Sequence, residues 1–335
     1  MVSADVSRVA VLGLGLVGGS LARLLHARGL AVVGYDADPA ALDAARDAGL
    51  ETADDVPGVL AGADLVVLAV PLRVMEPTAR EVARHVAGTA DATVTDVGSV
   101  KGPVRRAVEA AGLGERYVGA HPMAGTERSG FGASSADLVR GVPWAVTVTR
   151  ATAGGRLAAL LRLLTGPLEG TVAVLTDELH DEAAALVSHV PHVLATQLLN
   201  AVAGTPVREV ALGLAAGSFR DGTRVALTDP ARTEAMVVEN AAWVAPALRR
   251  AVRDLEMLVA ALETGAPVHG FFHAADGVRA VRREMPAEPG AARARGVQDE
   301  PPVALAGDWP AALRERCAAG AVVVGMTADE VLLGL

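Results

Sequence analysis

Short apolar runs alternate with helical patterns along the first 175 residues of the chain. The expected strands cover 8–14, 31–36, 64–70, 93–97, 117–120, 144–149 and 171–175. Apolar residues recur at helical spacing over 17–28 and 39–48, in the two stretches that separate the first three strands. This spacing predicts two helices. Strands that are apolar throughout and separated by helices are typical of a parallel sheet covered on both faces. We therefore expect a doubly wound, mostly parallel α/β sheet over 1–175.

Local signals mark the ends of the second helix. Asp38 is a residue type that caps helix N-termini, and Pro39 suits the first helical position. Gly49 follows the last helical residue, where a left-handed backbone commonly ends a helix. These three residues place that helix between two strands.

The pattern changes after Thr176. Helical spacing of apolar residues extends over 177–202, 233–262 and 272–283. Pro191 lies inside the first of these segments and is expected to kink it, because proline lacks the backbone N–H that an α-helix needs. We therefore expect a second, all-helical domain over 176–285.

The last part of the chain gives a weaker signal. Residues 286–308 are rich in proline, alanine, glycine and charge, and we interpret them as a linker. The final 27 residues are expected to form one helix and a strand at the sequence VVVGM. Residues 286–335 are therefore treated as a linker and a short C-terminal tail without an assigned role.

Composition narrows the class of protein. The chain has 335 residues, 51% of them hydrophobic, and a net charge of −9, which suits a two-domain globular protein and disfavours a nucleic-acid binder. The sequence contains no apolar run long enough to span a membrane and no signal-peptide pattern over Met1–Arg8. Cys317 is the only cysteine, which excludes an internal disulfide and a multi-cysteine metal site. We expect a cytoplasmic protein that binds neither nucleic acid nor membrane.

The sequence has a single lysine, Lys101, among 30 basic residues. Abundant alanine, glycine and arginine indicate a coding bias that removes lysine. A surviving lysine can mark a place where a compact ammonium is needed, since arginine does not replace it there. It can also have survived by chance, and the sequence leaves both interpretations open.

A glycine-rich loop follows the first expected strand. Gly13, Gly15 and Gly18 form a G-x-G-x-x-G motif that opens a helix, and Asp36 ends the next strand. This context is the fingerprint of a Rossmann-type dinucleotide-binding domain, with the pyrophosphate at the helix N-terminus and the acid on the ribose hydroxyls. Because a carboxylate would repel a 2′-phosphate and the two residues after Asp36 supply no cation, we expect NAD as the cofactor and 1–175 as its domain.

Polar segments follow two later strands at the edge where open α/β sheets bind ligands. Asp96 to Lys101 contains Ser99, and His121 to Thr126 follows the next strand. A histidine in this crevice can act as a general acid or base near neutral pH. His121 is therefore the candidate catalytic residue, with Ser99 beside it.

Two further histidines, His189 and His192, lie three positions apart on the expected helix over 177–202. A metal site there would need a third ligand, and the sequence offers none nearby. Packing or pocket lining is the favoured interpretation, so we expect no metal site.

Five segments together resemble the prephenate/arogenate dehydrogenase family of tyrosine biosynthesis. They are GLGLVGGSLA at 13–22, DVGSVK at 96–101, HPMAGTERSGF at 121–131, HDEAAALVSHVPH at 180–192 and SFRDGTRVALTDP at 218–230. Their order and their spread over residues 8–285 make the resemblance far more specific than any one of them. It implies NAD-dependent oxidative decarboxylation of prephenate or arogenate, and a helical substrate and dimerisation domain over 176–285 that forms a homodimer.

The resemblance also implies roles for individual residues. His121 would be the catalytic histidine, hydrogen-bonded to the C4 hydroxyl of the substrate ring, and Ser99 would help to hold that hydroxyl. Arg224 would bind a substrate carboxylate, since a guanidinium binds carboxylates bidentately. The other residues expected to line the pocket or lie near it are Thr126, His192 and Arg220.

The chain departs from the family pattern in two places. Thr233 stands where the family often has an aromatic residue, and no regulatory ACT domain is expected after residue 285. Direct inhibition by tyrosine at the active site and the choice between prephenate and arogenate stay open.

Two other classes of protein fit the sequence less well. A β-hydroxyacid-dehydrogenase-like enzyme is disfavoured, because such enzymes use a lysine in the helical domain and this chain has no lysine after Lys101. A non-catalytic NAD-binding module would not need His121, Ser99 and Arg224 together.

Overall fold

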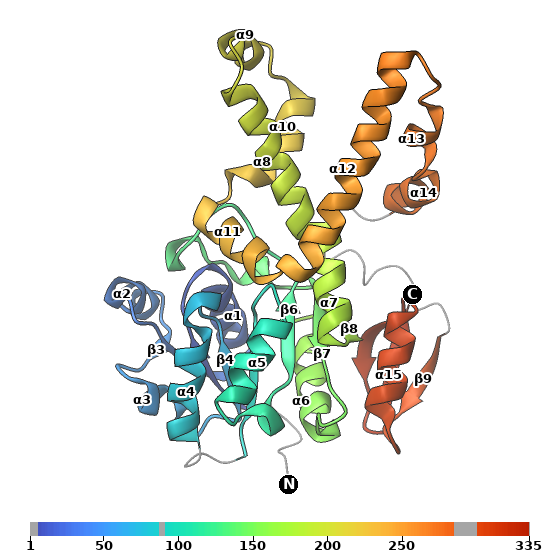
Figure 1. Cartoon of the computed structure of the whole chain (residues 1–335). Coiled ribbons are helices and arrows are strands. Elements are labelled where there is room, and N and C mark those ends of the chain that lie inside the picture. The colour runs from blue at the N-terminus through green and yellow to red at the C-terminus, as the bar shows by residue number, and fades with distance from the viewer. Residues whose placement is uncertain (1–5, 87–90, 285–299, 335) are drawn as a thin grey trace. The chain divides into compact units, whose positions relative to one another are not determined.

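The computed structural model describes residues 6–86, 91–284 and 300–334. These residues form two compact units (Figure 1). The first contains 6–181 together with 300–334, and the second contains 182–284. Within the described ranges, the model has no helix that is both long and apolar enough to cross a membrane.

A five-stranded parallel sheet forms the first half of the first unit. Its strands are β1 (Arg8–Leu12), β2 (Ala31–Tyr35), β3 (Glu51–Thr52), β4 (Leu65–Leu68) and β5 (Thr93–Asp96), in the order β3-β2-β1-β4-β5. Every adjacent pair is parallel. The expected doubly wound parallel sheet is thus confirmed for these strands.

Helices cover both faces of this sheet. They are α1 (Leu16–Ala27), α2 (Pro39–Asp47), α3 (Val56–Leu60), α4 (Met75–Val86) and α5 (Gly102–Ala110). On β1, Val9 and Val11 belong to the hydrophobic core shared with α1 and α2, whereas Ala10 and Leu12 belong to the core shared with α3, α4 and α5. Because successive strand residues point to opposite faces, burial on both sides accounts for the apolar residues all along β1.

The expected signals at the ends of α2 are confirmed. The Asp38 carboxylate accepts a hydrogen bond from the N–H of Ala40, and Pro39 is the first helical residue. Gly49 has φ of +81°, the left-handed region that favours glycine. The helix therefore begins and ends where the sequence indicates.

A second, mixed sheet continues from the edge of the first. It has the order β6-β7-β8-β10-β11-β9, with β6 (Gly119–Pro122), β7 (Pro143–Thr147), β8 (Thr171–Leu175), β9 (Glu300–Ala304), β10 (Val322–Met326) and β11 (Glu330–Gly334). A parallel bridge between Val94 and Tyr117 links the two sheets. In the second sheet the β7–β8 pair is parallel and the other pairs are antiparallel. The parallel arrangement expected over 1–175 therefore ends at β6, because β7 returns antiparallel to it.

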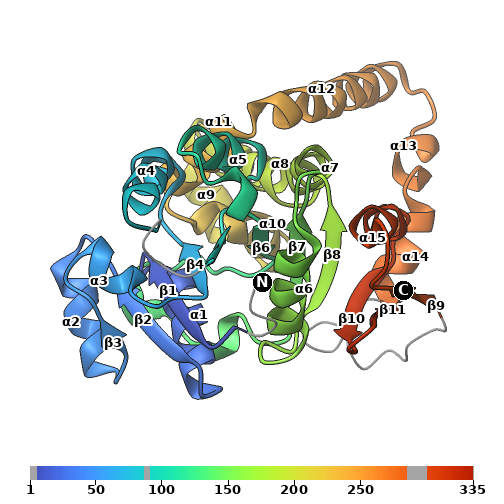
Figure 2. The ribbon, with the colours of Figure 1, turned by 90° about the horizontal axis from the view of Figure 1, so that it is seen from below.

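The segment 300–334 belongs to this second sheet (Figure 2). The expected helix and strand are found as α15 (Trp309–Ala318) and β10, while β9 and β11 were not expected. Leu313 and Val323 are fully buried in the core of the first unit, and α15 packs on β8 and on α6 (Gly154–Thr165). The interpretation of 286–308 as a linker is therefore wrong for 300–304, and 286–299 lies outside the described residues.

The second unit is helical, as expected. Its elements are α8 (Val190–Ala203), α9 (Arg208–Gly213), α10 (Gly217–Thr223), α11 (Pro230–Glu239), α12 (Ala241–Thr264), α13 (His269–His273) and α14 (Asp276–Glu284). The segment expected as one helix over 177–202 is α7 (Asp177–Ala184), a π-helical turn at Ala185–His189, and α8. Because Pro191 cannot donate a backbone hydrogen bond, the regular α-helical pattern is interrupted just before it. The segment expected over 233–262 is likewise divided at Asn240.

Candidate active site

The glycine loop connects β1 to α1 and has little space around two of its glycines. A Cβ on Gly13 would lie 2.4 Å from the carbonyl oxygen of Ala69, and φ of Gly13 is +101°. A Cβ on Gly18 would lie 2.0 Å from the carbonyl oxygen of Gly13. By contrast, a Cβ on Gly15 would have no neighbour within 4 Å among the described residues. The loop is thus closed against the sheet at two positions and open at the third, which is where a phosphate would approach the backbone.

Asp36 lies at the end of β2 and holds the glycine loop. Its Oδ2 accepts a hydrogen bond of 2.6 Å from the N–H of Leu14, and its Oδ1 accepts one of 2.9 Å from the N–H of Asp38. The carboxylate is half-buried and keeps acceptor capacity for a hydroxyl. Together with the N-terminus of α1, which no described side chain caps, these groups fit the ribose and pyrophosphate of a dinucleotide.

Asp96 joins the two segments that carry the candidate catalytic residues. It is fully buried at the end of β5. Its carboxylate accepts hydrogen bonds from the N–H of Gly98 at 2.8 Å and from the N–H of Ala120 at 3.2 Å. Gly98 directly precedes Ser99, and Ala120 directly precedes His121. One buried carboxylate therefore fixes both backbone segments at the same edge of the sheet.

Lys101 completes this buried cluster. Its ammonium forms an ion pair with Asp96 and donates a hydrogen bond of 2.7 Å to the carbonyl oxygen of Ala120. The Tyr117 hydroxyl donates to Asp96 at 2.7 Å. Burial lowers the pKa of Lys101 although the Asp96 charge opposes this, and burial followed by the Asp96 charge raises the pKa of Tyr117 well above its ordinary value. The lone lysine thus has a structural partner that arginine would be too large to share.

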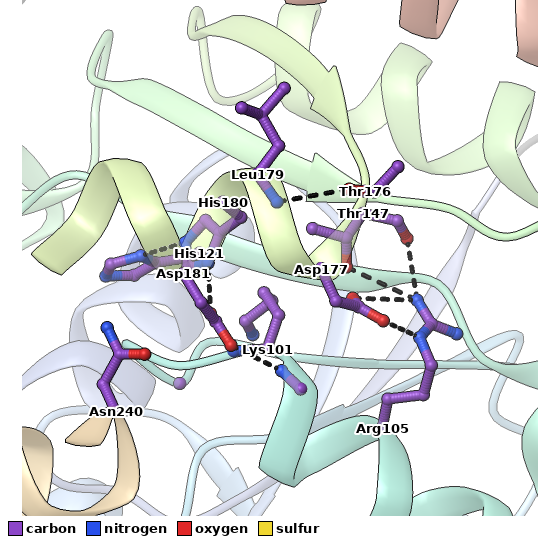
Figure 3. Close-up of polar contacts among 12 residues, drawn as sticks. Lys101, Arg105, His121, Thr147, Thr176, Asp177, Leu179, His180, Asp181 and Asn240 are labelled. Atoms are coloured by element: carbon purple, nitrogen blue, oxygen red, sulfur yellow. Dashed lines mark hydrogen bonds and ion pairs between the residues drawn. The ribbon is translucent and has the colours of Figure 1, made fainter. Parts of the chain in front are cut away.

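His121, at the end of β6, is the first of three hydrogen-bonded side chains (Figure 3). Its Nδ1 lies 2.9 Å from Nε2 of His180, and Nδ1 of His180 lies 2.8 Å from Oδ1 of Asp181. Asp181 also accepts hydrogen bonds from the N–H groups of Lys101 at 2.7 Å and Gly102 at 2.9 Å. The half-buried His121 is therefore connected through His180 to a carboxylate at the N-terminus of α5.

The pKa of Asp181 is below its ordinary value. Burial of this carboxylate would raise its pKa, but the hydrogen bonds from His180 and from the N–H groups of Lys101 and Gly102 outweigh it. Asp181 is accordingly held as a carboxylate, which can only accept hydrogen bonds.

A second buried ion pair fixes the beginning of α7. Arg105, on α5, pairs with Asp177, the first residue of α7. The guanidinium also donates to the carbonyl oxygen of Thr147 at 3.3 Å. Burial would lower the pKa of Arg105, but the hydrogen bond and charge of Asp177 raise it. Because His180 lies three residues after Asp177, this ion pair helps to set the position of the histidine.

Thr126 lies on the loop that follows β6. It lines a cavity of about 460 Å³ whose other walls include Glu127, Arg128, Ser135 and Asp137. The hydroxyl of Thr126 accepts a hydrogen bond of 3.2 Å from the N–H of Arg128. The predicted pocket residue thus borders a hollow made entirely of first-unit residues.

The other expected substrate residues lie in the second unit. His192 is on α8, Arg220 is on α10, and Arg224 begins a 3-10 turn, Arg224–Leu227. Within this unit α8 packs against α10 and against that turn. Nδ1 of His192 lies 2.8 Å from the carbonyl oxygen of Ser188, and both arginines are exposed. The structure therefore places His192, Arg220 and Arg224 on neighbouring elements of the second unit.

His180 and Asp181 belong to the segment HDEAAALVSHVPH but were not among the site residues expected from the sequence. Neither residue has a local pattern that indicates a site, because their partners are 59 and about 80 positions away. His189, which was considered with His192 for a metal site, is fully buried with Nδ1 2.9 Å from Nδ2 of Asn240. No group of three potential metal ligands is found among 6–86, 91–284 and 300–334.

Comparisons with known proteins agree with the two-part organisation. Residues 21–175 match the family model described as the prephenate dehydrogenase nucleotide-binding domain, and residues 176–269 match the prephenate dehydrogenase dimerization domain. A cyclohexadienyl dehydrogenase from Zymomonas mobilis is 35% identical over 264 residues, covering 76% of this chain and 88% of that protein.

Two solved structures are similar over most of the chain. A Corynebacterium glutamicum structure covers 95% of this chain and 99% of its own, with 33% identity and a TM-score of 0.79. The Aquifex aeolicus prephenate dehydrogenase in complex with hydroxyphenyl propionate and NAD⁺ covers 85% of this chain and 100% of its own, with 31% identity and a TM-score of 0.75.

Proposed function

Because the chain belongs to the prephenate dehydrogenase family, we propose that it catalyses the NAD-dependent oxidative decarboxylation of prephenate to 4-hydroxyphenylpyruvate in tyrosine biosynthesis. The observation that carries the proposal is the position of His121. It lies at the end of β6, fixed by Asp96 next to the Ser99 loop, at the sheet edge that also carries the glycine loop. This edge is where open α/β sheets bind cofactor and substrate.

The first unit supplies the cofactor site. Gly13 and Gly18 allow the tight turn and the close packing of α1, Gly15 leaves the backbone open to a pyrophosphate, and Asp36 accepts hydrogen bonds from the adenosine ribose. The carboxylate also disfavours the 2′-phosphate of NADP by charge repulsion. When bound, NAD⁺ supplies the acceptor for the hydride that leaves C4 of the substrate ring.

His121 and Ser99 act on the C4 hydroxyl. Ser99 holds the hydroxyl oxygen, and Nε2 of His121 takes its proton as the oxygen becomes a carbonyl. A positioned base of this kind contributes roughly 10²–10⁴-fold to the rate. The ring carboxylate then leaves as CO₂, and the electrons of the broken carbon–carbon bond aromatise the ring. His121 returns its proton to the C4 oxygen, which becomes the phenol hydroxyl, so the histidine ends in its starting state.

The second unit supplies substrate recognition. Arg224 binds a substrate carboxylate, because a guanidinium offers two parallel N–H donors. His192 and Arg220 lie on α8 and α10, the helices that pack against the turn of Arg224, and in this proposal they also contribute to substrate binding. Thr126 borders a cavity within the first unit. Thr233 takes the place of the aromatic residue common in the family, so the contact that this aromatic residue would make to the pocket across the dimer is missing or replaced in this chain.

The second unit also forms a homodimer in this proposal. Val252, Leu255, Val259 and Leu262 recur at helical spacing along α12, and each is about half exposed or more. Exposed apolar stripes of this kind mark protein–protein interfaces. The family model that matches this region is a dimerization domain. The dimer would act in the cytoplasm.

The experiment that tests the function follows NADH absorbance with the purified chain, NAD⁺ and either prephenate or arogenate. Turnover of prephenate in preference to arogenate supports the proposal. Turnover of arogenate alone would assign the chain to the other substrate of the family. Binding of NAD⁺ without turnover of either compound would contradict the proposal in favour of another reductase or a binding module.

A further inference from the structure

The mechanism above uses Nε2 of His121 but leaves the partners of its Nδ1 without a role. We propose that His180 and Asp181 are positioning residues that keep the proton of the His121 ring on Nδ1, so that Nε2 carries the lone pair that accepts the substrate proton. This inference rests on the proposed function, since it requires His121 to be the base.

The direction of each hydrogen bond follows from Asp181. Its two oxygens accept from the backbone N–H groups of Lys101 and Gly102, and Oδ1 also faces Nδ1 of His180. An ionised carboxylate has no proton to donate, so Nδ1 of His180 is the donor. In the neutral His180 ring Nε2 is then an acceptor. Its neighbour at 2.9 Å, Nδ1 of His121, is therefore the donor.

The fixed proton decides the chemistry of His121. A neutral imidazole carries one proton, and with that proton on Nδ1 the lone pair is on Nε2. The other tautomer would present an N–H to the substrate hydroxyl and could not take its proton. Because His180 is almost fully buried, water cannot readily replace it as the acceptor.

Charges around the three residues support the same arrangement. At the end of β5, Asp96 is paired with Lys101, the residue before α5, and at the start of α7, Asp177 is paired with Arg105. These two ion pairs are internally neutral. The charge of Asp181 is consequently well placed to stabilise the imidazolium that forms when His121 takes a proton, two hydrogen bonds away.

The α5 N-terminus gives Asp181 a second, purely structural role, so the test is centred on His180. His180→Leu removes the acceptor while keeping an apolar side chain of similar volume. His180→Gln can place its amide oxygen near the position of Nε2 and so restore an acceptor. His85→Gln, on the exposed face of α4, removes a histidine far from the site and is the matched control.

The primary measurement is the ¹⁵N chemical shift of the His121 ring in the full chain labelled with ¹⁵N-histidine, recorded without substrate. The resonance is assigned by its loss in His121→Asn. We expect the wild type and His85→Gln to carry the proton on Nδ1, His180→Leu to shift toward the Nε2–H tautomer, and His180→Gln to retain the wild-type signal. In kinetics, kcat of His180→Leu should fall roughly 10²-fold, with the KM for NAD⁺ unchanged and His180→Gln recovering most of the loss.

The outcomes separate the inference from the function. If His180→Leu folds, keeps the Nδ1–H signal and keeps kcat, the inference is wrong while the dehydrogenase activity stands. If His180→Leu does not fold, His180→Gln is used to test the inference. Because this variant still offers an acceptor, loss of its Nδ1–H signal and of its kcat would contradict the inference. If the wild type turns over neither prephenate nor arogenate, the proposed function fails, and the tautomer signals still decide how His121 is positioned.

Discussion

Lys101 and Asp96 form an ion pair in which neither side chain is exposed to solvent. Removing one partner of such a pair leaves the other buried and uncompensated, which typically costs about 3–5 kcal/mol. We therefore expect Lys101→Met to lower the free energy of unfolding, measured by urea denaturation, by an amount in this range. Arg80→Met, which breaks the exposed Arg80–Glu76 pair on α4, should change it by less than about 1 kcal/mol. Equal effects of the two variants would contradict the structural role of Lys101.

Two glycines of the same loop are expected to respond differently to alanine. In Gly18→Ala the new Cβ meets the carbonyl oxygen of Gly13, and overpacking of this kind costs about 1–3 kcal/mol of stability. In Gly15→Ala the methyl group has open space, so stability should stay within about 1 kcal/mol while NAD⁺ binding weakens, because the methyl group occupies the path of the phosphates. Thermal unfolding and calorimetric titration with NAD⁺ measure the two effects. Unchanged NAD⁺ affinity in a folded Gly15→Ala chain would be evidence against this cofactor site.

The carboxylate of Asp36 should determine the choice between NAD and NADP. Asp36→Asn keeps an oxygen that can accept from the N–H of Leu14 but removes the charge that repels a 2′-phosphate. We expect the ratio of kcat/KM for NADP to that for NAD to rise about tenfold or more. Asp38→Asn, two residues later and still able to cap α2, should leave the ratio unchanged. A ratio that moves equally in both variants would point to a general charge effect.

Asp181 should make stability depend on pH in one direction. Since its pKa in the folded chain is lowered, the folded state binds this proton less readily than the unfolded state does. Its stabilisation is thus fully present above the ordinary aspartate pKa of about 3.9, and it is lost as pH falls through the lower pKa of the folded chain. The difference in unfolding free energy between wild type and Asp181→Asn should be large at neutral pH and shrink below about pH 4.

Urea denaturation between neutral and acidic pH measures this difference. Asp43→Asn, on the exposed face of α2 beside Arg46, is the control and should differ little from wild type at any pH. A gap between wild type and Asp181→Asn that stays constant across the range would mean that ionisation of Asp181 does not contribute.

The stripe along α12 should control assembly. Leu255→Arg places a charge in the middle of the exposed apolar positions, and we expect the molar mass from light scattering to fall toward that of one chain, 34.0 kDa. Asp254→Arg changes charge on another face of the same helix and should keep the mass of the dimer. A Leu255→Arg chain that remains dimeric would place the interface elsewhere.

Features set by neighbouring residues were predictable from the sequence. The glycine loop, the Asp38 cap and the Gly49 stop depend on backbone conformations that only a few residue types adopt. The apolar strands β1, β2 and β4 were visible because strands buried on both faces are usually hydrophobic along their whole length. Their places in the structure match the pattern closely.

Features set by distant partners were not predictable in this way. His180 resembles any polar residue at the start of a helix until β6 brings His121 to it. The burial of Lys101 depends on its contacts with Asp96 and with the carbonyl oxygen of Ala120. The sequence alone therefore left open whether this single lysine had survived by chance or because an ammonium is needed there. Likewise β9 carries two prolines within the sequence EPPVA, which is unusual for a strand and conceals its place at the edge of the second sheet.

The pairing of Val172 on β8 with Val323 on β10 has a consequence for synthesis. On a ribosome the chain is made from its N-terminus, so the five-stranded sheet can assemble early, but the free edge of β8 must wait until the whole helical unit has emerged. Until then the apolar surface that α15 covers stays open to water or to a chaperone. Strands that are made after the helical unit therefore complete a sheet whose other strands are made before it.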